Sequence, residues 1–501
     1  MNVTKRTSLG ILVLCWVACQ SAADVGRSAE AERPNIVVAL ADDLGYGDLA
    51  CYGNPVIKTP NLDRLAAEGM RLTSYYAPAA NCSPSRTGLM TGRTPNRVGV
   101  YNWIPMFSPM HVGREEITIA TLLRSAGYST CHAGKWHLNG QFNLPGQPQP
   151  SDHGFDHWFS TQNNALPCHH DPDNFVRNGE PVGRLGGFSG PLVAGEAIRW
   201  LQRGRDPEKP FFLFVCFHEP HEPIATDERF VRMYSSDDPS LPVHHGNVTQ
   251  LDHAFGLLMQ AIDRLDLDED TLVFFASDNG PAITSYHPHG SAGPLRHKKG
   301  HLYEGGIRVP GIVRWPGHVP AGEVCDEPVS GLDLLPTLCE LVGIEAPKDR
   351  PLDGTSVLPV FEGQPIERKT PLYWQFNYAS SKPKVALRIG DWKLLAHLNT
   401  PEEKPTAGIT AESQQAIKAA EPTEFELYNL RDDLGETTDL AQKEPQRVVA
   451  MAEELKALFY EVRQECPTWP PFDWPRYEGK RIRAAQEAGI WPQWKKAPKP
   501  K

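Results

Sequence analysis

Cys82 lies in an unusual sequence setting. It begins a Cys-Ser-Pro-Ser-Arg segment that ends at Arg86, and a Thr-Gly-Arg triplet follows and ends at Arg93. A cysteine considered without its neighbours is most often a small, buried apolar residue. Here the Ser-Pro pair predicts a turn, and two arginines follow it closely. This setting makes Cys82 a candidate for chemistry.

Acidic side chains follow two predicted strands. The pair Asp42-Asp43 comes directly after the apolar run 35–40, and Asp278-Asn279 follows the apolar run 271–276. Ligands bind outside the carboxyl ends of strands in open α/β sheets, so both pairs should meet at one edge. Three carboxylates without a cation would raise one another's pKa, and an all-oxygen donor set favours calcium or magnesium over zinc. One pair alone would more simply cap a loop or helix, but two pairs at equivalent positions favour a metal site.

Lysines and histidines occur in three further segments. Lys135 and His137 belong to a Gly-Lys-Trp-His segment that follows a predicted strand at 128–132. His221 lies in a His-Glu-Pro-His-Glu-Pro segment after another predicted strand, and Lys299 precedes a glycine and then a Tyr-Glu-Gly-Gly segment. Each segment alone has an ordinary structural explanation, since a histidine near a strand end is more often structural than catalytic. Their interpretation depends on the series in which they occur.

In residues and in order, these segments resemble the signatures of the type I sulfatases, a family of the alkaline phosphatase superfamily. The maturation machinery of that family reads Cys-x-Pro-x-Arg with a downstream Thr-Gly-Arg element, and it oxidises the cysteine to formylglycine. The matching segments lie between residues 35 and 310, and two C-terminal patterns, at 391–393 and 426–430, agree as well. The resemblance implies an arylsulfatase-like sulfuric ester hydrolase that acts on a sulfated carbohydrate. It also implies a formylglycine-generating enzyme as a partner during maturation.

The resemblance implies a role for each matching residue. It implies one calcium ion, held by Asp42, Asp43, Cys82 as formylglycine, Asp278 and Asn279. It implies six catalytic residues, which are Cys82, Arg86, Lys135, His137, His221 and Lys299.

The implied chemistry explains why these residue types occur together. A sulfate monoester needs a nucleophile, neutralisation of charge on its oxygens and a proton for the leaving alcohol. Hydrated formylglycine is a geminal diol, and one hydroxyl attacks sulfur while the metal and the basic side chains offset charge, as in phosphoryl transfer. His221 and Lys299 then assist departure of the alcohol. The second hydroxyl, deprotonated with help from His137, collapses to the aldehyde and expels sulfate.

Two regions lie outside the matching pattern. Around Lys299, the family pattern commonly has glycine and threonine or serine. This chain has His297, Lys298 and His301 instead, and these differences bear on the shape of the substrate entrance. A polar insert either lines the leaving-group pocket or forms a solvated loop, and it contains His169, His170, Asp171, Asn174 and Arg177.

Two other functions are compatible with the sequence. A phosphatase or phosphonate monoester hydrolase of the same fold shares the metal and nucleophile, and a comparison of aryl sulfate with aryl phosphate esters would identify it. A non-catalytic carbohydrate-binding protein derived from the enzyme is the second. Such a protein should have lost Cys82, a metal ligand or a lysine, and none of these is missing.

The amino terminus and the charge limit the class of protein. An apolar run from Leu9 to Cys19 follows two basic residues, so 1–23 is expected to be the signal peptide of an exported, periplasmic or secreted protein. The run is too short to span a bilayer, and lipidation at Cys19 is the less favoured alternative. Export permits a disulfide, for which Cys325 and Cys339 are a conceivable pair. The net charge of -11 argues against nucleic acid as a partner, so a local basic pocket would bind an anionic substrate.

Short apolar runs alternate with helical periodicity from residue 34, which is typical of an α/β sheet. In this region we further expect a strand at 210–217 and helices at 61–69 and 247–265. Beyond about residue 365, we expect short strands at 372–376, 384–389, 392–397 and 426–430, followed by a helix at 447–462.

A chain of 501 residues is expected to form two domains. We expect an α/β fold with a large mixed central sheet flanked by helices, as in alkaline phosphatase, and a smaller C-terminal antiparallel sheet-plus-helix domain. The expected parts are a catalytic domain at 34–365, the C-terminal subdomain at 366–465 and an extended tail at 466–501.

Overall fold

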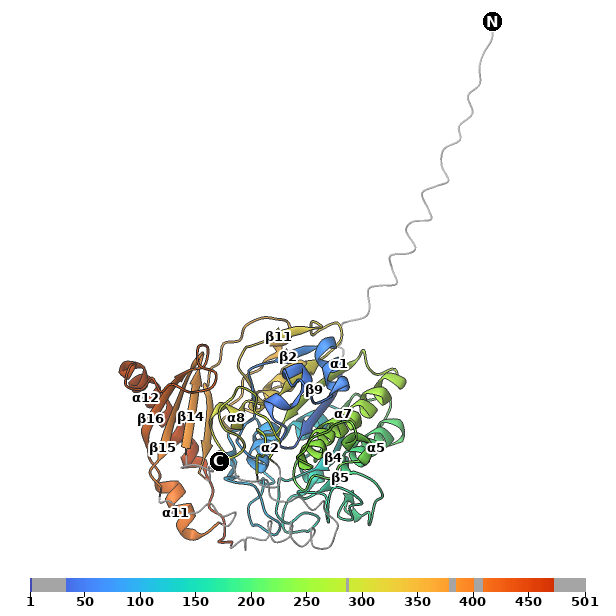
Figure 1. Cartoon of the computed structure of the whole chain (residues 1–501), viewed down its shortest axis with the longest axis horizontal. Helices are drawn as coiled ribbons and strands as arrows, with labels where there is room; N and C mark the ends of the chain where they lie inside the picture. The colour runs from blue at the N-terminus through green and yellow to red at the C-terminus, as the bar shows by residue number, and fades with distance from the viewer. Residues whose placement is uncertain (2–32, 285–287, 378–383, 401–408, 473–501) are drawn as a thin grey trace. The chain divides into compact units, whose positions relative to one another are not determined.

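The computed structural model of the chain describes residues 1, 33–284, 288–377, 384–400 and 409–472 (Figure 1). The signal peptide and the tail beyond residue 472 lie outside the described residues and stay predictions. Within the described part of the chain, we find no helix that is both long and apolar enough to cross a membrane.

A ten-stranded mixed sheet forms the larger part of the fold, in the order β11-β2-β10-β9-β1-β8-β4-β5-β6-β7. Its central parallel strands are β9 (Thr271–Ser277), β1 (Asn35–Ala41), β8 (Phe211–Cys216), β4 (Ser129–Lys135) and β5 (His157–Thr161). The outer strands are β11 (Glu323–Cys325), β2 (Met70–Leu72), β10 (Gly311–Arg314), β6 (Val176–Arg177) and β7 (Glu180–Pro181). Because helices cover both faces, β1, β8 and β9 are nearly continuous apolar runs, whereas β4 and β5 also carry buried polar residues.

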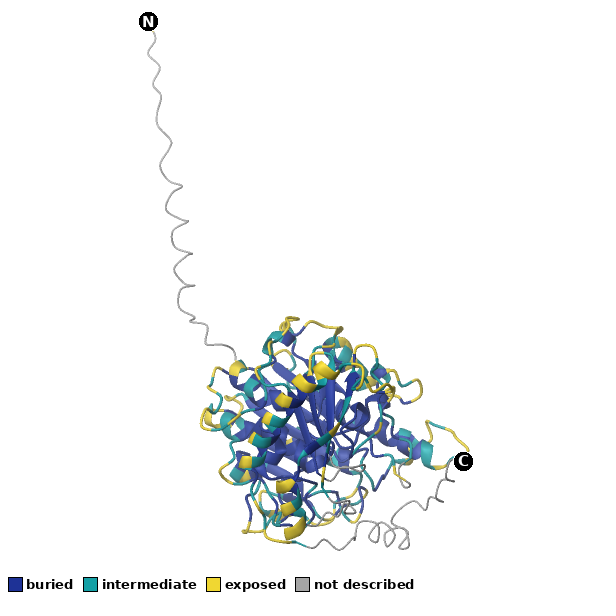
Figure 2. Ribbon diagram, turned by 90° about the vertical axis from the view of Figure 1, so that its left-hand side faces the viewer, coloured by how far each residue is buried: buried dark blue, intermediate teal, exposed yellow. Residues whose placement is uncertain are grey.

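Alternate side chains of β1 enter two separate cores, as the pleat of a strand requires. Val37 and Ala39 pack with the helices α1 (Pro60–Glu68), α5 (Ser189–Arg203) and α7 (Ser240–Arg264). On the other face, Ile36 and Val38 pack with α2 (Cys82–Thr91), α4 (Ile119–Ser125) and α9 (Leu334–Leu341). Figure 2 shows this buried sheet between its two helical layers.

A four-stranded antiparallel sheet follows in the C-terminal part, in the order β13 (Leu372–Phe376), β14 (Lys384–Ile389), β15 (Trp392–Leu398) and β16 (Pro422–Asn429). One face packs on α12 (Pro445–Glu465), the outermost helix at the left of Figure 1. The other face packs on Tyr76, Leu302 and Ile307 of the larger part. The C-terminal sheet therefore contacts the segment that carries Lys299.

The remaining elements are short. They are β3 (Tyr75–Tyr76) and β12 (Val329–Ser330), which pair; the helices α3 (Pro95–Val98), α6 (Glu228–Val231), α8 (Glu304–Ile307), α10 (Leu358–Phe361) and α11 (Ala411–Ala419); and the 3-10 turns η1 (Tyr46–Asp48), η2 (Ala50–Tyr52), η3 (Pro150–His153) and η4 (Gly331–Asp333).

The predicted fold class is confirmed, but four local predictions need correction. The Ser-Pro pair after Cys82 does not form a turn outside regular structure: it lies in the first turn of α2, where a proline loses no helical hydrogen bond. Strand β4 extends to Lys135, and α7 begins at Ser240. All eight described cysteines are free thiols, including Cys325 and Cys339.

Candidate active site

Acidic and amide side chains from the ends of β1 and β9 meet at one edge of the sheet. The two strands are parallel neighbours, so Asp42-Asp43 and Asp278-Asn279 follow them at the same edge. The N–H of Asp43 donates to Asp278 Oδ1 (3.1 Å), and Asn279 Nδ2 donates to Asp43 Oδ1 (2.7 Å). All four side chains are buried.

Helix α2 brings a sulfur and a guanidinium to this edge. Cys82 is its first residue, and its thiol donates to Asp42 Oδ1 (3.6 Å). Arg86 lies one helical turn later on the same face, which explains the spacing of the two residues. Its Nε and Nη2 donate to Asp278 Oδ2 (2.9 and 2.8 Å), and its Nη1 donates to the carbonyl of Lys135 (3.0 Å).

Two lysines form ion pairs with the carboxylates at the ends of the strands. Lys135, the last residue of β4, is fully buried, and its Nζ donates to Asp42 Oδ2 (2.6 Å). The preceding Gly134 has a φ of 108°, and a Cβ there would lie 1.8 Å from the carbonyl oxygen of Cys216 on β8. Lys299 donates to Asp43 Oδ2 (2.8 Å) and to the sulfur of Cys82 (3.4 Å).

His137 is a neutral, buried base with a defined tautomer. Its Nε2 lies 3.1 Å from the carbonyl of Ile104, which can only accept, so Nε2 carries the proton. Nδ1 is buried and has no hydrogen-bond partner among the described residues. Burial and the positive charges of Lys135 and Arg86 hold the pKa of His137 well below its usual range. Nδ1 therefore keeps a lone pair that can accept a proton.

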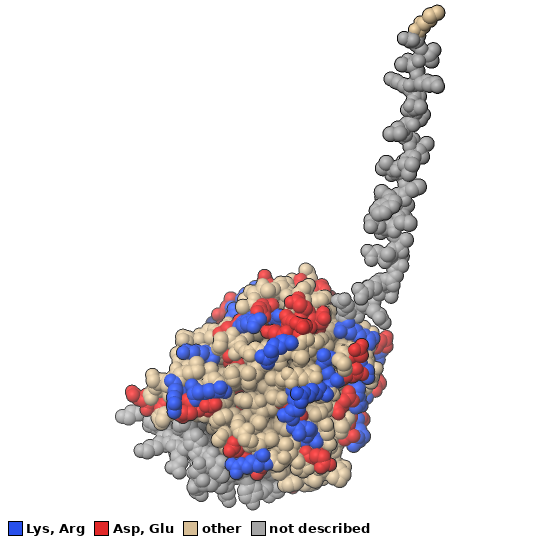
Figure 3. Space-filling view, turned by 90° about the vertical axis from the view of Figure 1, so that its right-hand side faces the viewer, with Lys and Arg blue, Asp and Glu red and all other residues tan. Residues whose placement is uncertain are grey.

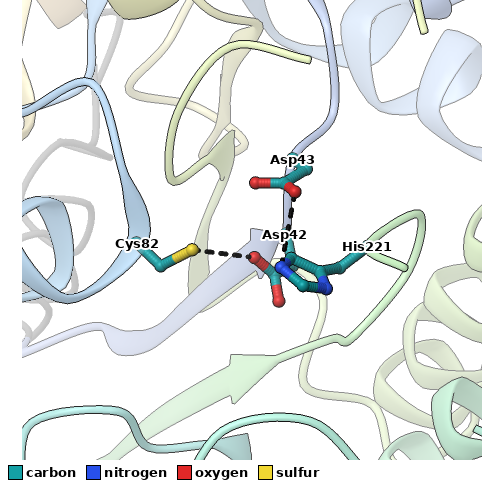
Figure 4. Close-up of side chains that lie close together, drawn as sticks. All are labelled: Asp42, Asp43, Cys82 and His221. Carbon is teal, nitrogen blue, oxygen red and sulfur yellow. Dashed lines mark hydrogen bonds and ion pairs between the residues drawn. The ribbon is translucent and has the colours of Figure 1, made fainter. Parts of the chain in front are cut away.

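His221 follows β8 and lies against the carboxylates. Its Nδ1 donates to the carbonyl of Glu222, which leaves Nε2 facing Asp43 Oδ2 at 3.5 Å. Figure 4 shows its ring pointing toward Asp42, Asp43 and Cys82. Both His137 (φ 59°) and Asp43 (φ 65°) have left-handed backbones, a strained conformation for non-glycine residues that is concentrated at functional sites.

The buried charges shift one another's pKa values. Burial alone would raise the pKa of Asp42, but the Lys135 ammonium, with His221 and Arg86, outweighs burial and holds that pKa well below its usual range. Burial and the neighbouring Asp42 raise the pKa of Asp278 to about 7. Burial also raises the pKa of the Cys82 thiol to about 12.

Carboxylate and amide oxygens at this edge could hold a divalent cation, with a thiol and an imidazole beside them. Ligand atoms of Asp42, Asp43, Cys82 and His221 all lie within 4.8 Å of one another (Figure 4). The buried Oδ1 of Asn279 has no hydrogen-bond partner in the described chain, so a further oxygen lone pair is present beside Asp43. Carboxylate and amide oxygens are the donors that calcium and magnesium take. The sequence assigned His221 to proton transfer only, and the structure adds it to the group around the carboxylates.

Most of the polar insert has structural partners. Arg177 forms an ion pair with Glu196 of α5 (2.7 Å), and Asp171 accepts from the N–H of Gly187 (2.8 Å). Asn174 bridges two backbone groups of its own loop. His170 is exposed, whereas His169 is buried with its ring 5.3 Å from that of His218. The insert therefore mainly holds its loop together, and of these five residues His169 is the one whose ring contacts that of His218.

Some contacts of the site could not be found by sequence reasoning. The pairing of Lys135 with Asp42 joins residues 93 positions apart, and that of Lys299 with Asp43 joins residues 256 positions apart. No local pattern specifies which cation meets which carboxylate. The neutral neighbour His218, whose Nε2 lies 2.8 Å from Thr161 Oγ1, is likewise defined only by the fold.

Comparison with known proteins gives consistent matches. A family model described as Sulfatase matches residues 34–344, and one described as N-sulphoglucosamine sulphohydrolase, C-terminal, matches residues 296–405. The chain is 37% identical over 440 residues to arylsulfatase A of Homo sapiens, covering 82% of this chain and 84% of that protein. It is 35% identical over 466 residues to N-acetylgalactosamine-6-sulfatase of Sus scrofa, covering 84% of each.

Solved structures agree with these sequence matches. The structure of Ps i-CgsB in complex with k-i-k-neocarrahexaose is similar with a TM-score of 0.76 and 27% identity, over 91% of this chain and 98% of that chain.

Proposed function

The chain belongs to the sulfatase family and is a sulfuric ester hydrolase, and we propose that it cleaves a sulfate monoester of a carbohydrate using calcium and a formylglycine formed from Cys82. The observation that carries this proposal is the meeting of Cys82 with three carboxylates and three cations at one sheet edge. A nucleophile position, ligands for a metal ion and a set of anion-binding donors would thereby be combined in one place.

The unmodified Cys82 thiol is poorly suited to attack an ester. Its raised pKa keeps it protonated at neutral pH, and the thiolate is the nucleophilic form. Formylglycine at this position would supply a hydrated aldehyde whose hydroxyl is the nucleophile. Every residue of α2 is buried, including Pro84 and Arg86, so an enzyme that reads this segment must act before the chain folds.

The oxygens of Asp42, Asp43, Asp278 and Asn279, together with position 82, would hold calcium. The ion would supply positive charge beside the reacting group. The pKa of Asp278 is raised to about 7, so near neutral pH a proton and a cation would compete for its carboxylate. A bound cation favours the ionised form of the carboxylate, which supports this role.

The remaining residues have separate tasks. Arg86, Lys135 and Lys299 supply N–H donors for the sulfate oxygens, which can only accept hydrogen bonds. Nδ1 of His137 is placed to accept a proton because its ring is neutral and Nε2 is already used by Ile104. His221 directs its Nε2 toward the carboxylate of Asp43 and is the candidate donor of a proton to the leaving alcohol.

The carbohydrate substrate and export are also proposed. Among the relatives, one is named N-acetylgalactosamine-6-sulfatase and one structure holds a neocarrahexaose, which supports a sulfated sugar here. The apolar run before Cys19 supports export. On the face shown in Figure 3, acidic and basic side chains are interspersed, so selectivity for an anion would come from the site and not from that surface.

A substrate comparison tests the proposal. Purified protein would be assayed for release of alcohol from matched aryl sulfate and aryl phosphate esters, and for free sulfate from a panel of sulfated mono- and polysaccharides. We expect turnover of the aryl sulfate and of at least one sulfated carbohydrate, and none by the Cys82→Ala control. A higher kcat/KM for the phosphate ester would instead support a phosphatase or phosphonate monoester hydrolase.

A further inference from the structure

Residues 298–301 form a tight turn beside the candidate active site. The N–H of His301 donates to the carbonyl of Lys298 (3.2 Å), and Gly300, the third residue of the turn, has a φ of 83°. A type II turn requires a positive φ at this position and therefore favours glycine. The turn presents two consecutive lysines, at its first and second positions.

Two histidines, His297 directly before this turn and His301 at its end, pack against each other. The rings of His297 and His301 stack with their centroids 4.4 Å apart and their planes 3° from parallel. Nδ1 of His301 also lies 3.2 Å from the carbonyl of Lys298 and 3.3 Å from that of Lys299. Because both carbonyls only accept, Nδ1 carries the proton and binds the turn together. These are the positions at which the sequence departs from the family pattern.

The two lysines of the turn have different surroundings. Lys299 is paired with Asp43 inside the site, as described above. Lys298 is half-buried, and its Nζ donates to the carbonyl of Ile283. Among the described residues it forms no ion pair, and an ammonium group has three donors, so one neutral acceptor leaves its charge unbalanced.

The ammonium of Lys298 contacts the segment that follows β9. Ile283 belongs to the segment that leads from β9 to the turn, and its neighbour Thr284 donates to Glu222 Oε2 (3.0 Å). Glu222 follows His221 directly. The Lys298 ammonium is therefore tied to the segment that follows β9, and that segment is hydrogen-bonded through Thr284 to Glu222, the residue after His221.

The other basic side chains around the turn have partners of their own. Lys384 is paired with Glu426 (2.6 Å), and Arg296 donates to the hydroxyl of Tyr428 (3.0 Å). Partial burial, followed by the charges of His301 and these basic side chains, lowers the pKa of His297 to about 4. Glu222 accepts a hydrogen bond from Thr284, and among the described residues it forms no ion pair with Lys298.

We propose that Lys298 is a second anion-binding residue of this site, which binds a further carboxylate or sulfate on the alcohol part of the substrate. The proposal rests on the proposed function and adds to it the charge of the substrate: the preferred carbohydrate carries at least two anionic groups. The rigid turn fixes Lys298 relative to Lys299, so the distance between the two bound anions is preset. A monosulfated sugar with no second anion leaves Lys298 unused.

Three substrates and three variants test this inference. The substrates are N-acetylgalactosamine 6-sulfate, the corresponding 4,6-disulfate, and a disaccharide of a uronic acid with N-acetylgalactosamine 6-sulfate, so that a second sulfate and a carboxylate are tested separately. Removal of one charge-assisted hydrogen bond is expected to cost about tenfold or more in binding. Lys298→Met should therefore lower kcat/KM for one or both doubly charged substrates about tenfold more than for the monosulfate. The loss should lie mainly in KM and should shrink at high salt.

Matched variants make the result specific. Lys298→Arg keeps the charge and should retain most of the preference. Lys209→Met removes the same charge before the amino end of β8, at the opposite edge of the sheet, and should leave the preference unchanged. Equal losses on all three substrates, or equal losses in Lys298→Arg and Lys298→Met, would overturn the inference.

A binding measurement separates this inference from the proposed function. The full-length Cys82→Ala protein, which cannot turn over, would be titrated calorimetrically with the monosulfate and with each doubly charged sugar. Tighter binding of a doubly charged sugar that is lost on adding Lys298→Met supports the anion site even if no sulfate is released by the parent protein. Equal affinities with and without Lys298 would refute it, whatever the hydrolytic activity.

Discussion

Substitution of Lys393 by methionine should weaken the link between the C-terminal sheet and the active-site segment. The ammonium of Lys393 is fully buried and lies 2.8 Å from Glu304 Oε1 and 2.9 Å from Glu436 Oε1. Glu304 belongs to the Tyr-Glu-Gly-Gly segment after Lys299, and Lys393 belongs to the Asp-Trp-Lys pattern on β15. Two motifs far apart in the sequence are thus joined by one buried cation.

The magnitude follows from the burial of all three groups. Removing one partner of a buried pair leaves uncompensated charge and costs about 3–5 kcal/mol. The unit Pro34–Lys501 unfolds with an entropy of about 1 kcal/mol per kelvin, taken at about 2.1 cal/mol/K per residue. We therefore expect Lys393→Met to lower the Tm by about 3–5 °C. Removal of the exposed lysine of the Lys348–Glu345 pair is the control, and it should leave the Tm almost unchanged.

The loss should depend on pH in a defined direction. Burial raises the pKa of Glu436 to about 7, so the folded state binds this proton more tightly than the unfolded state does. Stability from this group is present below its usual pKa and is lost as pH rises through about 7. Without Lys393 both carboxyl groups bind protons more readily, so the variant should lose more stability at pH 8 than at pH 5.

Scanning calorimetry or thermal circular dichroism at both pH values measures this difference. A Tm for Lys393→Met within about 1 °C of the Lys348→Met control at pH 8 would refute the reasoning, since it would mean that the buried carboxylates find other compensation.

The remaining predictions concern the site itself. Fully active protein should contain an aldehyde at position 82 by peptide mass spectrometry, and full activity with only an unmodified thiol there would contradict the assignment. Chelation should abolish turnover, and added calcium should restore it. The variant Asp278→Ala should lose activity and bound metal together. Full activity of the metal-stripped protein would exclude a metal-binding role for the carboxylates. Cys82→Ser offers one hydroxyl instead of two, so it should release at most one equivalent of alcohol and accumulate a sulfated serine, and sustained turnover would contradict the need for a diol.

The strand ends that build the site are predictable from sequence for a physical reason. Strands covered on both faces must be continuously apolar, so the runs at 35–40 and 271–276 identify β1 and β9 without knowledge of their partners. Parallel neighbours end at the same edge, so the polar residues after them are brought together by the topology alone. This is why Asp42 and Asp278 could be expected at one place.

Other features depend on contacts that no local pattern contains. Pro84 predicts a turn and instead lies in the first turn of helix α2, because a proline is equally compatible with a turn and with the first turn of a helix. Arg177, left open between a pocket and a solvated loop, pairs with Glu196. Lys393 and Glu304, which are 89 positions apart, meet only because the C-terminal sheet packs on the active-site segment.

The balance of buried charge connects the structure of the site with its chemistry. Arg86 and Lys135 are fully buried, and each is paired with a carboxylate at the end of a strand, as Lys299 is. A buried charge is tolerated only where it is paired, so these cations and carboxylates require one another for folding. A divalent cation held by the same carboxylates would take over part of that balance. The N–H donors of the three basic residues could then turn to the oxygens of a bound sulfate, so the pairs that stabilise the protein without substrate would also prepare the anion-binding groups that the reaction needs.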